Sequence, residues 1–213
     1  MRKLRIASIV VASFVGLCFA MPAAAQHVGI LQSAETNDEG TFKLMGAPMM
    51  VFGKDGADDE FGFGARGGYG FTERFDVEAK VGFFENSTFA GVDGEYWILQ
   101  GQEKDIGLDF SITGGVHVTF ARNENFDTVG FEITPQISGN VTKNLELCGA
   151  LDVSLVSVQD APPDFDDTFT RAHLVPGFEY RLSDALDLVG EIGIGLNDNA
   201  FTYASAGIAY YIR

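Results

Sequence analysis

Two histidines, His117 and His173, are the residues best suited to acid–base chemistry near neutral pH, because an imidazole titrates at about 6.5. A general base must lie within hydrogen-bond reach of the proton it takes. Asp109 lies four same-side positions from His117, and the neighbouring Asn123 and Glu124 complete no catalytic motif. We therefore expect neither catalysis nor a cofactor, and interpret both histidines as satisfied residues of an inner polar surface.

Charged side chains of both signs recur at alternating positions and point to such a surface. The residues that we expect to line it are Arg66, Asp76, Glu78, Lys80, Asp109, His117, Glu132, Asp152, Arg171, His173, Glu179, Arg181 and Glu191. Buried charges need partners, so an internal network that pairs acids with basic residues is the simpler interpretation. A lining that selects cations is the alternative, because acids are in excess.

Period-two alternation of apolar and polar residues is the main structural signal, and it predicts strands. It keeps its phase from Ile106 to Ala121, where a helix would lose it. The same pattern recurs at 61–71, 75–84, 129–141, 145–156, 171–182 and 186–196. With a first strand over 41–52 and a last over 201–212, the chain is predicted to form ten strands.

A repeated turn motif divides these strands. Residues 71–77, 141–147 and 182–188 share the order apolar, Ser or Thr, two mostly polar residues, apolar, acid, apolar. The hydroxyl can bond the nearby backbone and favour a tight turn. Their spacing predicts a further short turn at 102–105. Longer connections are expected at 53–60, 85–94, 122–127, 159–167 and 197–200.

The N-terminus has the features of a secretory signal peptide. Arg2, Lys3 and Arg5 precede an uncharged run, and small residues end at Ala25. The run is shorter than the roughly 20 residues of a membrane-spanning helix. We expect a cleaved signal peptide over 1–25, a flexible lead-in over 26–40 and a barrel domain over 41–213.

Composition excludes several classes of protein. The formal net charge of −16 argues against nucleic-acid binding, for which a basic face supplies most of the affinity. After cleavage Cys148 is the remaining cysteine, so we expect neither a disulfide nor a cysteine-based metal site. Acidic clusters at 55–60 and 160–167 lack the EF-hand spacing, and we interpret them as solvated loops that could reach divalent ions bridging lipopolysaccharide.

Strand length and aromatic residues decide which face is outside. A soluble lipocalin-like barrel has its apolar face inside, whereas a membrane barrel inverts this arrangement. Strands of about 10 to 12 residues suit a membrane band about 25 Å tall. Aromatic residues such as Phe52, Phe71 and Tyr210 gather at strand ends, as in interfacial girdles. We predict an all-β, ten-stranded antiparallel up-and-down transmembrane β-barrel.

This pattern resembles the small outer-membrane β-barrels of Gram-negative bacteria, of the OmpA-like and OmpW-like kinds. The resemblance covers 41–213 and implies an outer-membrane location, contact with outer-membrane lipid and lipopolysaccharide, and insertion by the outer-membrane assembly machinery. Such barrels usually end on an aromatic residue, whereas this chain ends Tyr210-Tyr211-Ile212-Arg213.

Three functions stay open from the sequence. The first is a monomeric structural barrel whose loops contact the cell exterior. The second is a narrow pore or small-ligand conduit, favoured by inner glycines such as Gly62, Gly130 and Gly193, which leave volume empty. The third is a soluble periplasmic barrel that binds an apolar ligand.

Overall fold

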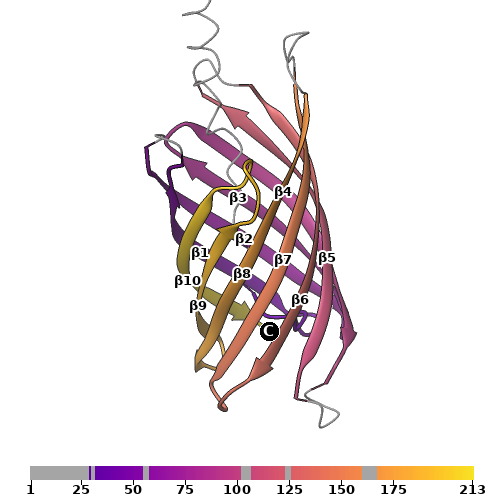
Figure 1. Cartoon of the computed structure of the whole chain (residues 1–213). Helices are drawn as coiled ribbons and strands as arrows, with labels where there is room; N and C mark the ends of the chain where they lie inside the picture. Colours follow the sequence, from indigo (N-terminus) through magenta and orange to yellow (C-terminus); the bar gives the residue numbers. More distant parts are fainter. Residues whose placement is uncertain (1–28, 30–31, 55–57, 102–106, 123–125, 160–166) are drawn as a thin grey trace, which may run out of the picture.

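Ten antiparallel strands close into a single barrel in which β1 pairs with β10 (Figure 1). The computed structural model describes residues 29, 32–54, 58–101, 107–122, 126–159 and 167–213. The strands are β1 (Phe42–Phe52), β2 (Glu60–Thr72), β3 (Phe75–Phe84), β4 (Ser87–Leu99), β5 (Asp109–Ala121), β6 (Thr128–Asn140), β7 (Leu145–Val158), β8 (Thr168–Ser183), β9 (Leu186–Gly195) and β10 (Thr202–Ile212). The predicted fold class and strand number are therefore confirmed.

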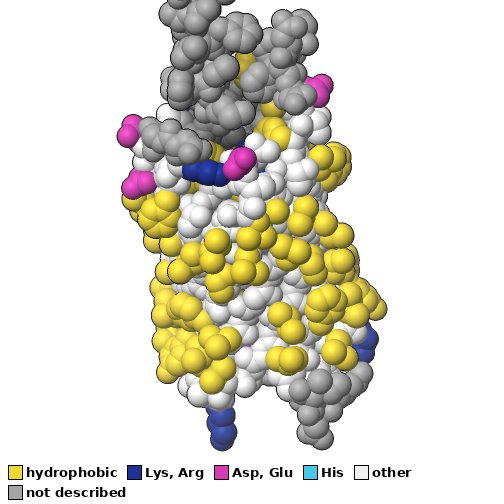
Figure 2. All heavy atoms as spheres, viewed as in Figure 1, with side chains coloured by type: hydrophobic (Ala, Val, Ile, Leu, Met, Phe, Trp, Pro, Cys, Tyr) yellow, Lys and Arg dark blue, Asp and Glu magenta, His cyan; other side chains and the backbone are white. Residues whose placement is uncertain are grey.

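Alternating residues face opposite sides of the barrel wall. In β6, Glu132 and Gln136 are buried inside, whereas Phe131 and Ile133 are 60% and 50% exposed outside. Figure 2 shows apolar side chains over the middle of the outer surface, with charged groups toward the two ends. This is the arrangement of a membrane barrel and the inverse of a lipocalin. The soluble-barrel alternative was therefore wrong.

The repeated turn motif forms three tight turns at one end of the barrel, the short-turn end, at the bottom of Figure 1. Arg74 N donates to Thr72 Oγ1 at 3.2 Å, and Asn144 N donates to Thr142 Oγ1 at 3.3 Å. Ser183 Oγ accepts from the backbone of the third turn at 3.4 Å. The predicted role of the hydroxyl is confirmed in each turn.

One predicted long loop is a strand instead. Residues 85–94 were expected to connect strands, but β4 begins at Ser87 and only residues 85–86 separate it from β3. The alternation is present but disguised, because Phe89 faces inward whereas Thr88 and Gly94 lie on the outer face. Asp93 and Glu95 consequently belong to the barrel wall.

The start of β5 also differs from the prediction. The strand begins at Asp109, not at residue 106, and Gly107 precedes it with a φ of 77°. Gly107 is therefore a turn residue with left-handed backbone, not part of the barrel lining. The short turn expected at 102–105 lies outside the described residues.

Among the described residues no helix is long and apolar enough to cross a membrane. Most of the two acidic loop clusters, including 55–57 and 160–166, lies outside the described residues. Of the acids that are described, Glu60 belongs to β2 and is buried, and its Oε1 accepts from Asn86 N at 2.8 Å. Asp59 Oδ1 accepts from Gly53 N at 2.8 Å, which closes the connection between β1 and β2.

Candidate functional site in the barrel lumen

Most of the predicted lining residues do face the inside of the barrel. Eleven of them are buried: Arg66, Asp76, Glu78, Lys80, Asp109, His117, Glu132, Asp152, Arg171, His173 and Glu191. Glu179 is half-buried, and Arg181 is exposed next to the turn between β8 and β9. The alternation and the burial of these side chains therefore coincide, except close to a turn, where the inner surface opens to water.

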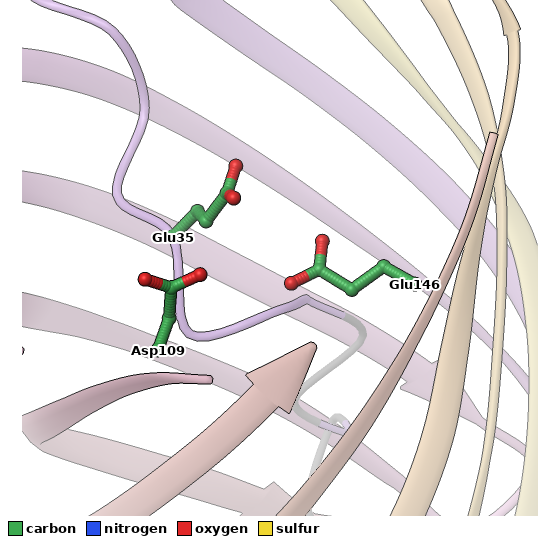
Figure 3. Close-up of side chains that lie close together, drawn as sticks. All are labelled: Glu35, Asp109 and Glu146. Atoms are coloured by element: carbon green, nitrogen blue, oxygen red, sulfur yellow. The ribbon is translucent and has the colours of Figure 1, made fainter. Parts of the chain in front are cut away.

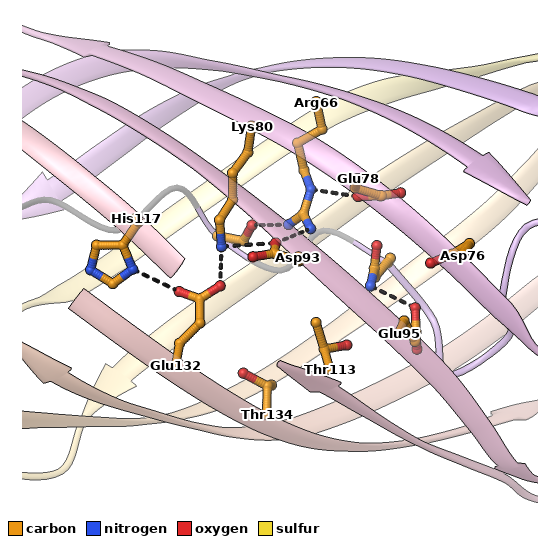
Figure 4. A network of polar contacts seen from close by, with 12 residues as sticks. Arg66, Asp76, Glu78, Lys80, Asp93, Glu95, Thr113, His117, Glu132 and Thr134 are labelled. Carbon is orange, nitrogen blue, oxygen red and sulfur yellow. Dashed lines mark hydrogen bonds and ion pairs between the residues drawn. The ribbon is translucent and has the colours of Figure 1, made fainter. Parts of the chain in front are cut away.

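An ion-pair network crosses the middle of the lumen (Figure 4). Arg66 of β2 contacts Glu78 Oε2 at 2.7 Å and Asp93 Oδ2 at 3.1 Å. Lys80 of β3 contacts the same Asp93 oxygen at 2.9 Å and also pairs with Glu132 of β6. All five side chains are almost fully buried. The network thus ties β2, β3, β4 and β6 together from inside, as the pairing interpretation expected.

His117 extends this network on its β5 side. Its Nδ1 lies 3.2 Å from Glu132 Oε2, and its ring stacks on Phe89 with centroids 5.0 Å apart. Asp109, the acid named with it in the sequence analysis, instead accepts a hydrogen bond from Gly101 N at 2.8 Å. His117 therefore joins the wall to the network instead of pairing with Asp109.

A second polar group links β6, β7 and β8. His173 Nδ1 lies 3.4 Å from Asp152 Oδ2, and Thr134 Oγ1 donates to Asp152 Oδ1 at 3.0 Å. The other ring nitrogen, Nε2, lies 3.1 Å from Phe201 O. Both nitrogens face oxygen acceptors, so neither presents a lone pair to a substrate. This geometry fits a structural histidine better than a general base.

The sequence analysis missed three wall residues of the network. Asp93 was assigned to the loop expected at 85–94, and neither Glu95 nor Lys43 was placed on a face. Lys43 Nζ contacts Glu78 Oε1 at 3.1 Å, so it adds a third cation beside Arg66 and Lys80. The signal that could have found the two acids is their phase, which matches Phe89 and Gly91 along the strand.

The N-terminal segment enters the lumen and completes the site. We call its described residues, Gly29 and 32–40, the inner segment. Arg66 Nη1 donates to Gly29 O at 2.6 Å, and Gln32 Nε2 donates to Glu95 Oε2 at 2.8 Å. Ala34 N donates to Ser138 Oγ at 3.1 Å. A flexible lead-in was expected here, but these residues are held by the wall because their polar groups match it.

The same segment is fixed at the short-turn end. The backbone N and Nδ2 of Asn37 both donate to Asp76 Oδ2, at 2.8 and 2.6 Å. Gly40 N donates to Gly70 O at 2.9 Å, and Asp38 pairs with Arg213 at 3.2 Å. The inner segment therefore passes from the central network to the turns before β1 begins.

Three carboxyl groups meet where the inner segment crosses β5 and β7 (Figure 3). One oxygen each of Glu35, Asp109 and Glu146 lies within 4.8 Å of the others. Burial, with the charges of Glu146 and Asp109, raises the pKa of Glu35 from an ordinary 4.5 to about 8. The three carboxyl groups are close enough to share one positive charge. At neutral pH a proton on Glu35 supplies that charge.

The described residues enclose two small polar cavities inside the barrel. The cavity beside Gln32, Arg66, Lys80 and Glu132 measures about 10 Å³, which holds at most about one water molecule. A second polar cavity at the short-turn end, lined by Glu35 and Lys43 among others, measures about 80 Å³. Toward the opposite end Met49, Val51, Phe84, Phe89 and Tyr203 form an apolar layer.

Inner glycines do not leave the empty volume that the sequence analysis inferred. A Cβ at Gly62 would overlap Phe84, and one at Gly193 would overlap Tyr203. These are directly paired residues of adjacent strands, so each glycine makes room for a large neighbour. The glycines therefore accept large side chains from the neighbouring strands, and these side chains fill the lumen. This removes the main sequence argument for an open path through the barrel.

Comparisons with solved structures find several bacterial outer-membrane proteins that are similar to this chain. The outer-membrane barrel domain of OprF from Pseudomonas aeruginosa shares 12% identity over 83% of this chain and 100% of that chain, with a TM-score of 0.38. OprG from the same organism shares 14% identity over 85% of this chain and 100% of that chain, with a TM-score of 0.42. Omp33 from Acinetobacter baumannii shares 12% identity over 85% of this chain and 100% of that chain, with a TM-score of 0.43.

No curated protein matches the sequence. A family model matches residues 10–209, which is nearly the whole chain, and it describes an outer membrane protein beta-barrel domain. The match agrees with the closed ten-stranded barrel and with its apolar outer face. The chain therefore belongs to the outer membrane protein beta-barrel domain family and is a protein of the outer membrane.

Proposed function

We propose that this protein is a closed structural barrel of the outer membrane, whose loops make its contacts with the cell exterior. The observation that carries the proposal is the cavity of about 10 Å³ at the level of Arg66 and Lys80. A hydrated ion needs a continuous water path, and a space that holds at most about one water molecule does not provide it. The ion pairs and the inner segment act together to close this level.

A narrow conduit is the second candidate, favoured by the construction of the closure. Part of the closing material is the inner segment, which is not a strand and which contacts the wall through hydrogen bonds such as that from Gln32 to Glu95. If the segment leaves, the freed surface carries Asp109, Glu146 and Glu191 and would favour cations. This candidate requires movement, whereas the closed barrel does not.

Planar-bilayer recording at pH 6 separates the two candidates. We expect no conductance steps from the wild-type chain. A variant that lacks residues 29–40, shown to be folded by its heat-modifiable migration on SDS gels, should give small steps that favour cations. Wild-type steps that change in Arg66→Ala or Asp109→Asn would contradict the closed barrel and support the conduit.

Other parts of the proposal concern processing and partners. Residues 1–25 act as a signal peptide that is cleaved after Ala25, which mass spectrometry of the protein from outer membranes would test. The barrel is a monomer without catalytic activity. It contacts lipopolysaccharide and is inserted by the outer-membrane assembly machinery, to which Tyr210 and Tyr211 offer the aromatic C-terminal signal ahead of Arg213.

A further inference from the structure

The outer surface of the barrel is hollowed where β8, β9, β10 and β1 lie side by side. A groove of about 600 Å³ crosses these strands, and short side chains form its floor: Pro48, Gly190, Ala204 and Ala206. Phe61, Leu147 and Ile192 border it and are exposed. Figure 2 shows this face of the barrel, with white backbone atoms visible between the apolar side chains. We call this surface the outer groove.

The register of the strands brings the short residues together. Ala206 pairs directly with Gly190 of β9, and Ala204 pairs with Met50 of β1. The ring of Phe178 lies over Gly190 and forms the side of the outer groove toward β8. Large side chains cover the outer face elsewhere, so the wall is thinner along this line.

The polar atoms of the floor are satisfied within the wall. Pro48 has no N–H to give to the ladder between β1 and β10, and its carbonyl oxygen accepts a hydrogen bond from Ser205 Oγ at 2.9 Å. Glu191 is the charged residue among the described residues that line the outer groove, and its carboxylate lies beside Gly29 in the lumen. The outer groove therefore presents an apolar surface, which suits hydrocarbon.

The position of the outer groove decides what covers it. Pro48, Gly190 and Ala206 lie near the middle of their strands, at the level of the membrane hydrocarbon. The outer groove is also continuous with the band of exposed apolar side chains that faces lipid in an outer-membrane barrel. Its occupant is therefore a component of the membrane and not a solute from water.

We propose that the outer groove is a binding site for one acyl chain of a zwitterionic phospholipid. Its volume lies within the range of about 300–1,000 Å³ that is typical of ligand sites. An unfilled hollow would forfeit van der Waals contacts, which are the main source of association in lipid. A flexible, unbranched chain can follow the floor across the strands and restore these contacts.

The charge of the lining favours a phospholipid without net charge over lipopolysaccharide. Phosphate groups that bind specifically are held by Arg or Lys, and the described residues that line the outer groove include neither. The binding inferred here is independent of the proposed closed-barrel function, because it concerns the outer face and not the lumen. Conductance measurements would therefore leave it unchanged.

Photo-crosslinking in a bilayer tests the site. The protein, purified from outer membranes, is reconstituted in vesicles of phosphatidylethanolamine and phosphatidylcholine that contain a phosphatidylethanolamine with a diazirine in the middle of one acyl chain. Adducts are mapped by mass spectrometry of the digested chain. We expect them to be enriched in β9 and β10 over the equally deep, lipid-facing part of β3 around Ala79. Uniform labelling around the wall would overturn the proposal.

A matched pair of variants identifies the outer groove as the cause of the enrichment. Ala206→Phe fills the floor, whereas Ala79→Phe adds the same side chain to the exposed outer face of β3. The first should abolish the enrichment and the second should preserve it, with heat-modifiable migration showing that both barrels are folded. If Ala206→Phe does not fold, Ala204→Leu fills the same floor with a smaller side chain. Enrichment that persists in the folded, filled variant would overturn the site.

Two further arms of the experiment identify the occupant. Addition of lipopolysaccharide to the vesicles should leave the adducts in β9 and β10 unchanged, and their loss would overturn the assignment to a phospholipid. The adducts should also be independent of the protein-to-lipid ratio. A decrease at high protein content, confined to β9 and β10 and absent in Ala206→Phe, would show that a second copy of the chain occupies the outer groove and would overturn the proposal.

Discussion

His117 of β5 stands directly opposite Gly130 of β6, and its imidazole lies over that glycine in the place of a side chain. The ring is held there from two sides, by Glu132 at 3.2 Å and by the stacked ring of Phe89. The pair shows how the lumen is filled: a glycine on one strand receives a large residue from the next.

Gly130→Ala should therefore destabilise the barrel, because the added methyl group has to displace the imidazole from its contact with Glu132. Overpacking of this kind costs about 1–3 kcal/mol of unfolding free energy. Urea unfolding in lipid vesicles measures the change. Gly114→Ala in β5 is the control, since its nearest neighbour is a carbonyl oxygen at 3.9 Å. Equal stability of the two variants would contradict the filled lumen.

Lys80→Met should cost more. The substitution removes the cation that Asp93 and Glu132 share while both carboxyl groups stay buried. Breaking a buried pair from one side typically costs about 3–5 kcal/mol. Lys54→Met provides the comparison, because Lys54 and Asp198 form an exposed pair at 3.3 Å whose loss should not be measurable. Similar midpoints of unfolding for both variants would show that the network carries little energy.

Asn37→Ala tests the anchor of the inner segment. It removes the hydrogen bond from Nδ2 to Asp76 at 2.6 Å and keeps the one from the backbone. Thr36 is buried, so a Thr36→Cys reporter in a chain with Cys18→Ala and Cys148→Ala reacts with a polar maleimide when the segment leaves the lumen. A net loss of about 0.5–1.5 kcal/mol raises the rate of this labelling by about two- to tenfold. Asp38→Asn, which alters an exposed pair with Arg213, should leave the rate unchanged. A larger increase in the labelling rate for Asp38→Asn than for Asn37→Ala would show that Asn37 does not anchor the inner segment.

The outer face can be tested in the same way. Ile133 is 50% exposed near the middle of β6, and an arginine at the membrane midplane costs about 2–4 kcal/mol. Val141 is 60% exposed in a turn at the barrel end, where the cost falls to about 0–1 kcal/mol. Unfolding from vesicles should therefore be easier for Ile133→Arg than for Val141→Arg. No difference between them would mean that Ile133 faces water.

The strands of the barrel wall could be predicted from the sequence because the patterns that determine them lie within short stretches of the chain. Period-two alternation gives the face of each residue, and the turn motif at residues such as Thr72 and Thr142 marks the short-turn end. The exception, β4, failed for a physical reason. Phe89 faces inward to stack on His117, and this contact across strands breaks the pattern that the neighbouring residues follow.

The inner segment could not be predicted because its contacts are distant in the chain. Gln32 bonds Glu95, and Ala34 bonds Ser138, so no periodicity within 26–40 encodes them. The polar composition of the segment is equally typical of a flexible lead-in. Its role became visible only when the closed barrel placed Asp76, Glu95 and Ser138 around one space.

Amide hydrogen exchange of the inner segment tests the central claim most directly. Ala34 N, Asn37 N and Gly40 N donate to Ser138, Asp76 and Gly70, respectively. In NMR exchange experiments on the folded barrel at pH 6, these three amides should be protected to a degree that approaches that of the strand amides. Complete exchange within the dead time, with the strands still protected, would show that the segment lies outside the lumen and would contradict the account.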